Sequence, residues 1–180
     1  SLIVPSGMIS KKNRTSTQIS PAMKKLLASL FFVFTTLFTY GQQFHVASYN
    51  VRYANPADEQ RGNGWSQRCP VICNQIAYES FDLVGMQEVL KSQFDDLSNR
   101  LSRDYGCIGV GRNDGKTSGE YAPIFYKKDR FILLDSGCFW LSETPDKPSV
   151  GWDAKYPRIC SWAQLQDRNT GNTLYFLNTH

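Results

Sequence analysis

Histidine is scarce in this chain, and its cysteines lack the paired motifs of a zinc site. The 180 residues include two histidines, His45 and His180, and five cysteines. Cys69 and Cys73 are spaced i, i+4, but no second pair accompanies them. A four-ligand structural zinc site is therefore disfavoured. Both cysteines fall on an apolar stripe, so burial is favoured over a disulfide, and the odd count leaves at least one cysteine unpaired.

A net positive charge is also missing from most of the chain. The sequence has a net charge of +4, but residues 1–41 hold five basic residues and no acidic one, leaving 15 basic and 16 acidic residues in the remainder. Proteins that bind DNA usually present a basic patch or stripe. The charge therefore argues against a sequence-specific DNA binder and, more weakly, against a nuclease of duplex DNA.

The apolar run near the N-terminus is too short to cross a membrane. Leu26–Tyr40 has 15 residues, whereas a spanning helix needs about 20. It follows Met23-Lys24-Lys25 and ends at the small residue Gly41, a pattern typical of a secretory signal peptide, although a buried helix would share its composition. We therefore predict an unstructured upstream extension at 1–22, a signal peptide at 23–41 and an exported domain at 42–180, periplasmic or extracellular and without a transmembrane anchor.

The exported part begins with alternating strand and helix patterns and continues with strands only. This order predicts an α/β domain built in layers. Ser92 and Asp95 have the spacing of a capping box at the start of the second helix. Residues 168–172 are typical of a hairpin turn. Strands are predicted at 44–50, 81–89, 105–110, 122–126, 131–141, 158–167 and 173–179, and helices from Ser66 to Tyr78 and from Ser92 through Leu101.

Polar side chains gather at the predicted strand ends. Glu88 closes the short apolar run Leu83–Met86, at the kind of position where a rigid scaffold holds a functional group, although a solvated strand-end glutamate is the plain alternative. A carboxylate for a hard cation, guanidinium groups for phosphate oxygens and an imidazole beside an acid together suit the chemistry of a phosphate ester. The other residues of this kind are Asn50, Arg52, Glu120, Arg158 and His180.

Four segments, in this order, resemble motifs of the endonuclease/exonuclease/phosphatase superfamily, which includes DNase I-like nucleases, sphingomyelinases and inositol phosphatases. The resemblance extends from about Phe44 to the end of the chain. It implies a four-layer α/β sandwich of the DNase I type. The segments are Ala47-Ser48-Tyr49-Asn50-Val51-Arg52, Asp82-Leu83-Val84-Gly85-Met86-Gln87-Glu88-Val89, Gly119-Glu120-Tyr121-Ala122-Pro123-Ile124-Phe125-Tyr126 and Leu177-Asn178-Thr179-His180.

The resemblance also implies a role for each site residue. Glu88 would ligate a catalytic Mg²⁺ or Mn²⁺, and Asn50 would lie close to the metal and the scissile phosphate. Glu120 would orient His180, which would contact a phosphate oxygen or assist the leaving group. The residues implied in substrate binding are Arg52, Arg158 and Tyr121.

The family pattern continues beyond His180 with an Asp-x-Asn motif and a late Asp-His pair that this sequence does not contain. We therefore expect roughly the first half of the sandwich, nearly inactive as 180 residues because the group that activates the water is missing. We also expect an inner sheet face without its cover, which would favour aggregation or a loosely folded state. The residues of that face are Ile159, Ser161, Ala163, Leu165, Leu174 and Phe176.

The sequence thus predicts a metal-dependent phosphoesterase that acts by in-line attack of water. Its substrate could be a nucleic acid, a phospholipid, or a sugar or inositol phosphate, and no stable protein partner is implied. The alternative is a catalytically idle module on the same fold, which would hold a glycan or lipid with the aromatic segment around Trp140, Trp152 and Trp162.

Overall fold

The computed structural model describes residues 20–37 and 43–180. The chain divides into two compact units, Ser1–Gln42 and Gln43–His180. The elements are α1 Pro21–Leu37, β1 Val46–Asn50, α2 Pro56–Gln60, α3 Trp65–Glu79, β2 Leu83–Gln87, α4 Lys91–Leu101, β3 Tyr105–Ile108, β4 Ile124–Lys127, β5 Phe131–Trp140, β6 Ile159–Asp167 and β7 Thr173–Thr179.

The first unit contains the helix α1, which begins two residues before Met23. It covers part of the apolar run that suggests a signal peptide, while the expected cleavage position at Gly41 lies outside the described residues. None of the helices in the described parts of the chain is both long enough and apolar enough to cross a membrane.

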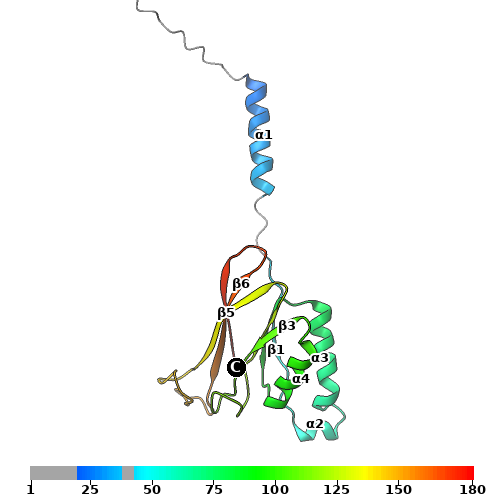
Figure 1. The fold of residues 1–180 in the computed structure, drawn as a ribbon, viewed down its shortest axis with the longest axis vertical. Coiled ribbons are helices and arrows are strands. Elements are labelled where there is room, and N and C mark those ends of the chain that lie inside the picture. Colours follow the sequence, from blue (N-terminus) through cyan, green and yellow to red (C-terminus); the bar gives the residue numbers. More distant parts are fainter. Residues whose placement is uncertain (1–19, 38–42) are drawn as a thin grey trace, which may run out of the picture. The chain divides into compact units, whose positions relative to one another are not determined.

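In the second unit, the first sheet has the strand order β1-β2-β4-β3. β1 and β2 run parallel, with Asn50 opposite Gln87, and β4 is antiparallel to β2. All five residues of β2 are buried, because α3 and α4 cover one face of this sheet and the second sheet covers the other (Figure 1). Glu88 therefore follows the most enclosed strand of the domain.

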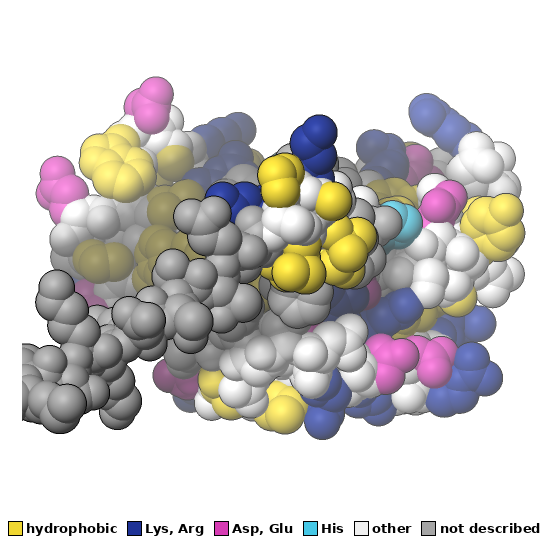
Figure 2. Space-filling model, turned by 90° about the horizontal axis from the view of Figure 1, so that it is seen from above, with side chains coloured by type: hydrophobic (Ala, Val, Ile, Leu, Met, Phe, Trp, Pro, Cys, Tyr) yellow, Lys and Arg dark blue, Asp and Glu magenta, His cyan; other side chains and the backbone are white. Residues whose placement is uncertain are grey.

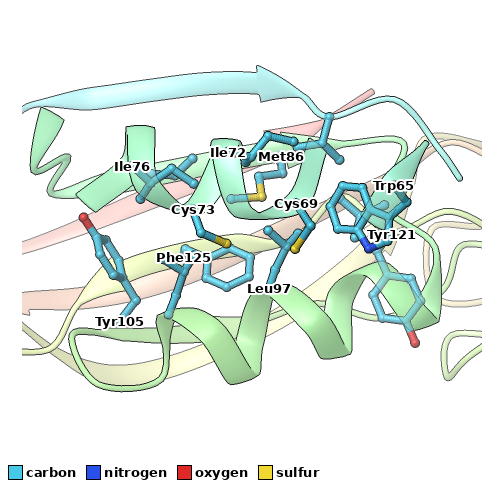
Figure 3. Packing of buried hydrophobic residues seen from close by; sticks show 14 residues of the cluster. Trp65, Cys69, Ile72, Cys73, Ile76, Met86, Leu97, Tyr105, Tyr121 and Phe125 are labelled. Carbon is cyan, nitrogen blue, oxygen red and sulfur yellow. The ribbon is translucent and has the colours of Figure 1, made fainter. Parts of the chain in front are cut away.

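The helix-covered face of the first sheet forms the largest core cluster. Cys69, Ile72 and Cys73 of α3 and Leu97 of α4 surround Met86 and Phe125 from the sheet (Figure 3). Both cysteines are buried and free, as their place on the apolar stripe predicts. α3 ends at Glu79, and the next residue, Ser80, caps the helix with a φ of 56° in the left-handed region.

The second sheet has the order β5-β6-β7, with antiparallel pairing throughout. The prediction that its inner face lacks a cover is wrong. Ala163 and Leu165 are fully buried against Leu83 and Ile124 of the first sheet, and Leu174 and Phe176 pack on the same cluster. The first sheet is itself the covering layer, so residues 43–180 contain three layers in the order helices, sheet, sheet.

Apolar side chains remain exposed on the opposite face of the second sheet. Tyr175 is 61% exposed and Leu177 is 54% exposed. They alternate along β7 with the partly buried Leu174 and Phe176, as the two faces of a strand require. In the four-layer sandwich this outer face would carry the remaining helical layer, which the described residues do not include.

Each predicted strand and helix has a counterpart in the structure, with bounds that differ by at most two residues, but the sequence does not predict the short helix α2 and one helix cap differs. β7 has the predicted bounds, and the turn after Asp167 closes the β6–β7 hairpin with Gly171 at a φ of 75°. The capping box predicted for Ser92 and Asp95 is not formed. Instead, the side chain of Gln93 accepts a hydrogen bond from the backbone N–H of Leu90 at 3.1 Å.

Candidate active site

Glu88 turns away from the end of β2 in a left-handed conformation, with a φ of 60°. Its carboxylate accepts a hydrogen bond from Asn50 Nδ2 at 2.9 Å and one from the backbone N–H of Tyr53 at 3.2 Å. Arg52, which also has a positive φ of 57°, donates its backbone N–H to Asn50 Oδ1 at 2.8 Å. Two strained non-glycine residues thus face each other at the ends of β1 and β2, a feature that clusters at functional sites.

The environment of Glu88 keeps its carboxylate charged. Partial burial acts to raise the pKa, but the hydrogen bonds from Asn50 and Tyr53, together with the charges of His180 and Arg52, bring it below its usual value. At neutral pH the side chain is therefore an anion. Val89 and Tyr121 pair through their backbones, so Glu88 and Glu120, the residues just before them, lie on neighbouring segments, and Glu120 in turn lies beside His180.

Arg52 is held by a carboxylate that the sequence motifs do not indicate. Its Nε and Nη2 donate to the two oxygens of Asp58 at 2.6 and 2.9 Å. The side chain of Arg52 is 54% exposed and that of Asp58 is 10% exposed. This bidentate pair fixes the guanidinium beside Glu88. It uses the Nε–Nη2 edge of the guanidinium and leaves Nη1 outside the pair.

Replacing Asp58 with asparagine is expected to lower the free energy of unfolding at pH 7 and to lower it less at pH 3. The hydrogen bond from Arg52 lowers the pKa of Asp58 in the folded chain. The pair therefore stabilises the fold fully above the unfolded-state pKa of about 3.9, and this contribution declines as the pH falls from that value through the lower pKa of the folded state. Urea unfolding at the two pH values measures the difference.

The matched control is Asp95→Asn, which removes the partner of Lys91 in an exposed i, i+4 pair. Such pairs contribute little to stability, so this variant should unfold like the parent at both pH values. Equal losses for Asp58→Asn at pH 7 and pH 3 would show that its carboxylate does not act through its charge.

The second half of the site lies around His180, at the end of β7. Glu120 Oε2 is 3.9 Å from His180 Nδ1. Arg158 Nη1 donates to the backbone carbonyl of His180 at 3.4 Å. Glu120 Oε2 also receives a hydrogen bond from Arg112 Nη1 at 2.8 Å. The structure thus brings Asn50, Arg52 and Glu88 together on the ends of the first sheet, and Glu120, Arg158 and His180 together beside β6 and β7.

The structure places Tyr121 in the core, contrary to the substrate-binding role expected for it. Its side chain is 2% exposed, and its ring stacks on Phe94 with the centroids 5.2 Å apart. Its hydroxyl donates to the carbonyl of Lys116 at 3.0 Å. Tyr121 therefore packs in the core next to Glu120, and its hydroxyl, the one donor of the side chain, already binds within the chain.

The donor set at Glu88 fits a magnesium ion better than a transition metal. It offers one charged carboxylate beside a neutral amide, and Mg²⁺ in phosphate-processing sites takes one or two carboxylates and completes its shell with water and substrate phosphate. In the ranges 20–37 and 43–180, no three His, Cys, Asp or Glu side chains gather as a metal cluster. A closed protein cage of the zinc type is therefore not present among these residues.

Three side chains that support this site are not indicated by the sequence motifs. Asp58 holds Arg52, Arg112 holds Glu120, and Gln93 accepts a hydrogen bond from the backbone N–H of Ala54 at 2.9 Å. Asp58 and Arg112 lie six and eight residues along the chain from the side chains that they hold, whereas Gln93 lies 39 residues from Ala54. Only the acidic first turn of α2, which contains Asp58, gives a local signal.

Three solved structures that are 48–51% identical to this chain over the aligned residues share its fold. An endonuclease/exonuclease/phosphatase family protein from Bacteroides thetaiotaomicron is 51% identical, with a TM-score of 0.73 over 75% of this chain and 49% of its own. A mannosyl-6-phosphatase from the same species is 50% identical, with a TM-score of 0.74 over 77% and 51%. A family protein from Bacteroides vulgatus is 48% identical, with a TM-score of 0.74 over 78% and 53%.

These three matches show the family to which the chain belongs and the share of the family's domain that it covers. No protein-family model matches the sequence, and the chain spans about half the length of each of the three structures. The motifs in their expected order, the facing sheets and the near-50% identity agree with one another. The chain belongs to the endonuclease/exonuclease/phosphatase family and contains part of that family's α/β sandwich domain.

Proposed function

We propose that this chain supplies part of the active site of a metal-dependent phosphoric ester hydrolase. The observation that carries the proposal is the charged carboxylate of Glu88, which lies beside Asn50 at the ends of two parallel strands, within electrostatic reach of His180. A carboxylate, an amide and an imidazole at one edge are the groups that a cation-assisted attack of water on phosphorus uses.

In this proposal Glu88 holds a Mg²⁺ or Mn²⁺ ion, and Asn50 orients the Glu88 carboxylate and lies next to the phosphate. When bound, the cation would neutralise charge on the phosphate oxygens. The N–H groups of Arg52 that Asp58 leaves free donate to the phosphate. Arg158, which lies beside His180, binds the phosphate from that side. Glu120 orients His180, which donates a hydrogen bond to a phosphate oxygen or assists departure of the leaving alcohol.

A phosphate monoester of a sugar is the substrate class that we favour. The support is the 50% identity with a mannosyl-6-phosphatase. On the face of the molecule in Figure 2, basic and acidic side chains are interspersed. Outside residues 1–41 the chain has 15 basic and 16 acidic residues, a balance that gives a nucleic-acid backbone little to follow. We further propose that residues 23–41 direct export, which would place the enzyme in the periplasm or outside the cell.

The alternative of an idle glycan- or lipid-binding module has less support. Trp152 is 73% exposed and suits such a role, but Trp140 is 5% exposed. Its indole Nε1 donates to the carbonyl of Arg112 at 2.7 Å. An aromatic surface formed by both residues is therefore not available for a ligand.

A chimera tests the proposed function. Residues 43–180 of this chain are joined to the C-terminal half of the Bacteroides thetaiotaomicron mannosyl-6-phosphatase, and phosphate release from mannose 6-phosphate is measured with Mg²⁺. We expect turnover that requires Mg²⁺. Because Glu88 would hold the charge-neutralising cation, Glu88→Gln should lower kcat/KM by at least about 100-fold.

The control is Glu79→Gln, which changes an exposed carboxylate at the end of α3 and should leave kcat/KM unchanged. Binding of Mn²⁺ to the 180-residue chain, followed by electron paramagnetic resonance, gives an independent readout that needs no turnover. If Glu88→Gln leaves both turnover and Mn²⁺ binding at the parent level, the assignment of Glu88 is wrong.

A further inference from the structure

Arg112 lies behind the Glu120–His180 pair, on the loop between β3 and β4. Its side chain is 14% exposed, and Nη1 donates to Glu120 Oε2 at 2.8 Å. The same oxygen is the one that lies 3.9 Å from His180 Nδ1. Any movement of Arg112 would therefore move the carboxylate oxygen that faces the imidazole.

The position of Arg112 is itself fixed from three directions. Its backbone N–H donates to the carbonyl of Glu120 at 3.1 Å. Its own carbonyl accepts the indole N–H of the buried Trp140 at 2.7 Å. Its guanidinium lies over the ring of Tyr156, 5.4 Å from the centroid. Arg112 thus connects Glu120 to the second sheet and to the loop that precedes β6.

Stability alone gives a weak reason for an arginine at this position. A buried ion pair often contributes less than apolar side chains of the same volume would, because both charges lose their water. Here Arg112 Nε is also buried and has no hydrogen-bond partner among the described residues, which adds a desolvation cost. A guanidinium nevertheless does what an apolar side chain cannot, since it fixes the direction of a carboxylate.

We propose that Arg112 is a positioning residue that aims Glu120 Oε2 at His180 Nδ1 and so sets the orientation and tautomer of the imidazole. At 3.9 Å the two atoms are too far apart for a hydrogen bond, so the negative charge of Glu120 favours a proton on Nδ1, which leaves Nε2 to face the substrate. The importance of this orientation for turnover rests on the proposed function. The orientation itself is a property of the chain and is measured without metal or substrate.

Nuclear magnetic resonance of the imidazole nitrogens tests the proposal in the 180-residue chain. The chain has two histidines, so a His45→Gln background leaves His180 as the sole imidazole signal. We expect Arg112→Met to move the ¹⁵N shifts of His180 toward those of a free imidazole in rapid tautomer exchange. Glu120→Gln should have the same effect, and the double variant should add nothing further, because both changes break one chain of contacts.

Arg112→Lys keeps the charge and should restore part of the parent spectrum. If Arg112→Met does not fold, Arg112→Gln replaces it. Arg103→Met is the matched control, because Arg103 is 90% exposed and pairs with Asp104; it should leave His180 unchanged. Parent-like His180 shifts in a folded Arg112→Met or Arg112→Gln chain would overturn the proposal. That result would not touch the Glu88 test, which depends on metal binding and turnover.

Discussion

Asn178→Ala is expected to lower the free energy of unfolding by about 2–4 kcal/mol, since it removes three buried hydrogen bonds between the two sheets. Asn178 is 7% exposed. Its Nδ2 donates to the carbonyls of Met86 and Pro123 at 2.7 and 2.9 Å, and its Oδ1 accepts from Gln87 Nε2 at 2.8 Å. These bonds join β7 of the second sheet to the first sheet directly behind Glu88. Urea unfolding measures the loss.

Gly85 provides the counterpart, because a side chain there would occupy the place of Asn178. A Cβ at Gly85 would lie 2.6 Å from Asn178 Oδ1 and 2.7 Å from its Cγ, closer than real contacts allow. Gly85→Ala alone should therefore destabilise the chain. In the Asn178→Ala background the new methyl group enters vacated space, so the double variant should be more stable than the sum of the two changes by at least about 1 kcal/mol.

Gly62→Ala controls for the effect of an added methyl group. A Cβ at Gly62 would have nothing within 4 Å among the described residues, although the φ of 75° makes any side chain there strained. Its cost should simply add to that of Asn178→Ala. Additive costs for Gly85→Ala and Asn178→Ala would mean that the two sheets adjust to the clash, and that Asn178 does not lock them at this point.

Local signals account for the parts of the fold that sequence reasoning predicts. The apolar run Leu83–Met86 is too short for a helix and is bounded by polar residues, which places Glu88 at a strand end without any knowledge of the tertiary structure. The stripe Cys69, Ile72, Cys73 and Ile76 predicts α3 to within one residue at each end. In both cases a periodic pattern of buried side chains carries the information.

Contacts between distant segments account for the errors. The spacing of Ile159, Ala163 and Leu165 identifies an inner face but not its cover, which is supplied by Leu83 and Ile124 of the first sheet. The contact of Gly85 with Asn178 joins segments that lie in different sheets. A sequence pattern shows which side of a strand is apolar, but the partner of that side depends on how the layers stack.

The same limit applies to the candidate site. The ends of the strands indicate Asn50, Glu88 and His180, because functional groups gather where strands stop. They do not show that Asp58 takes two donors of Arg52, or that the side chain of Tyr121 turns inward. The aromatic ring that looks available for a substrate in the sequence is instead part of the packing between α4 and the sheet.

Gln93→Leu is expected to lower the free energy of unfolding by about 3–5 kcal/mol, because a fully buried side chain loses three hydrogen bonds to the backbone and the N–H groups of Leu90 and Ala54 lose their acceptor. Gln93 is fully buried. Its Oε1 accepts the N–H groups of Leu90 and Ala54 at 3.1 and 2.9 Å, and its Nε2 donates to the carbonyl of Arg52 at 3.0 Å. Leucine fills a similar volume and removes all three bonds, so urea unfolding reports the polar contribution.

This variant should also weaken Mn²⁺ binding by about 10-fold or more, because Gln93 holds the segment whose N–H at Tyr53 fixes the Glu88 carboxylate. Ser92→Ala is the control: Ser92 is exposed, and its loss should change neither unfolding nor Mn²⁺ binding appreciably. The reverse pattern, with a stable Gln93→Leu chain and a destabilised Ser92→Ala chain, would reinstate the cap that the sequence alone predicts. A loss of stability in Gln93→Leu with parent-like Mn²⁺ affinity would separate the helix cap from the cation site and leave Glu88 held by Asn50 alone.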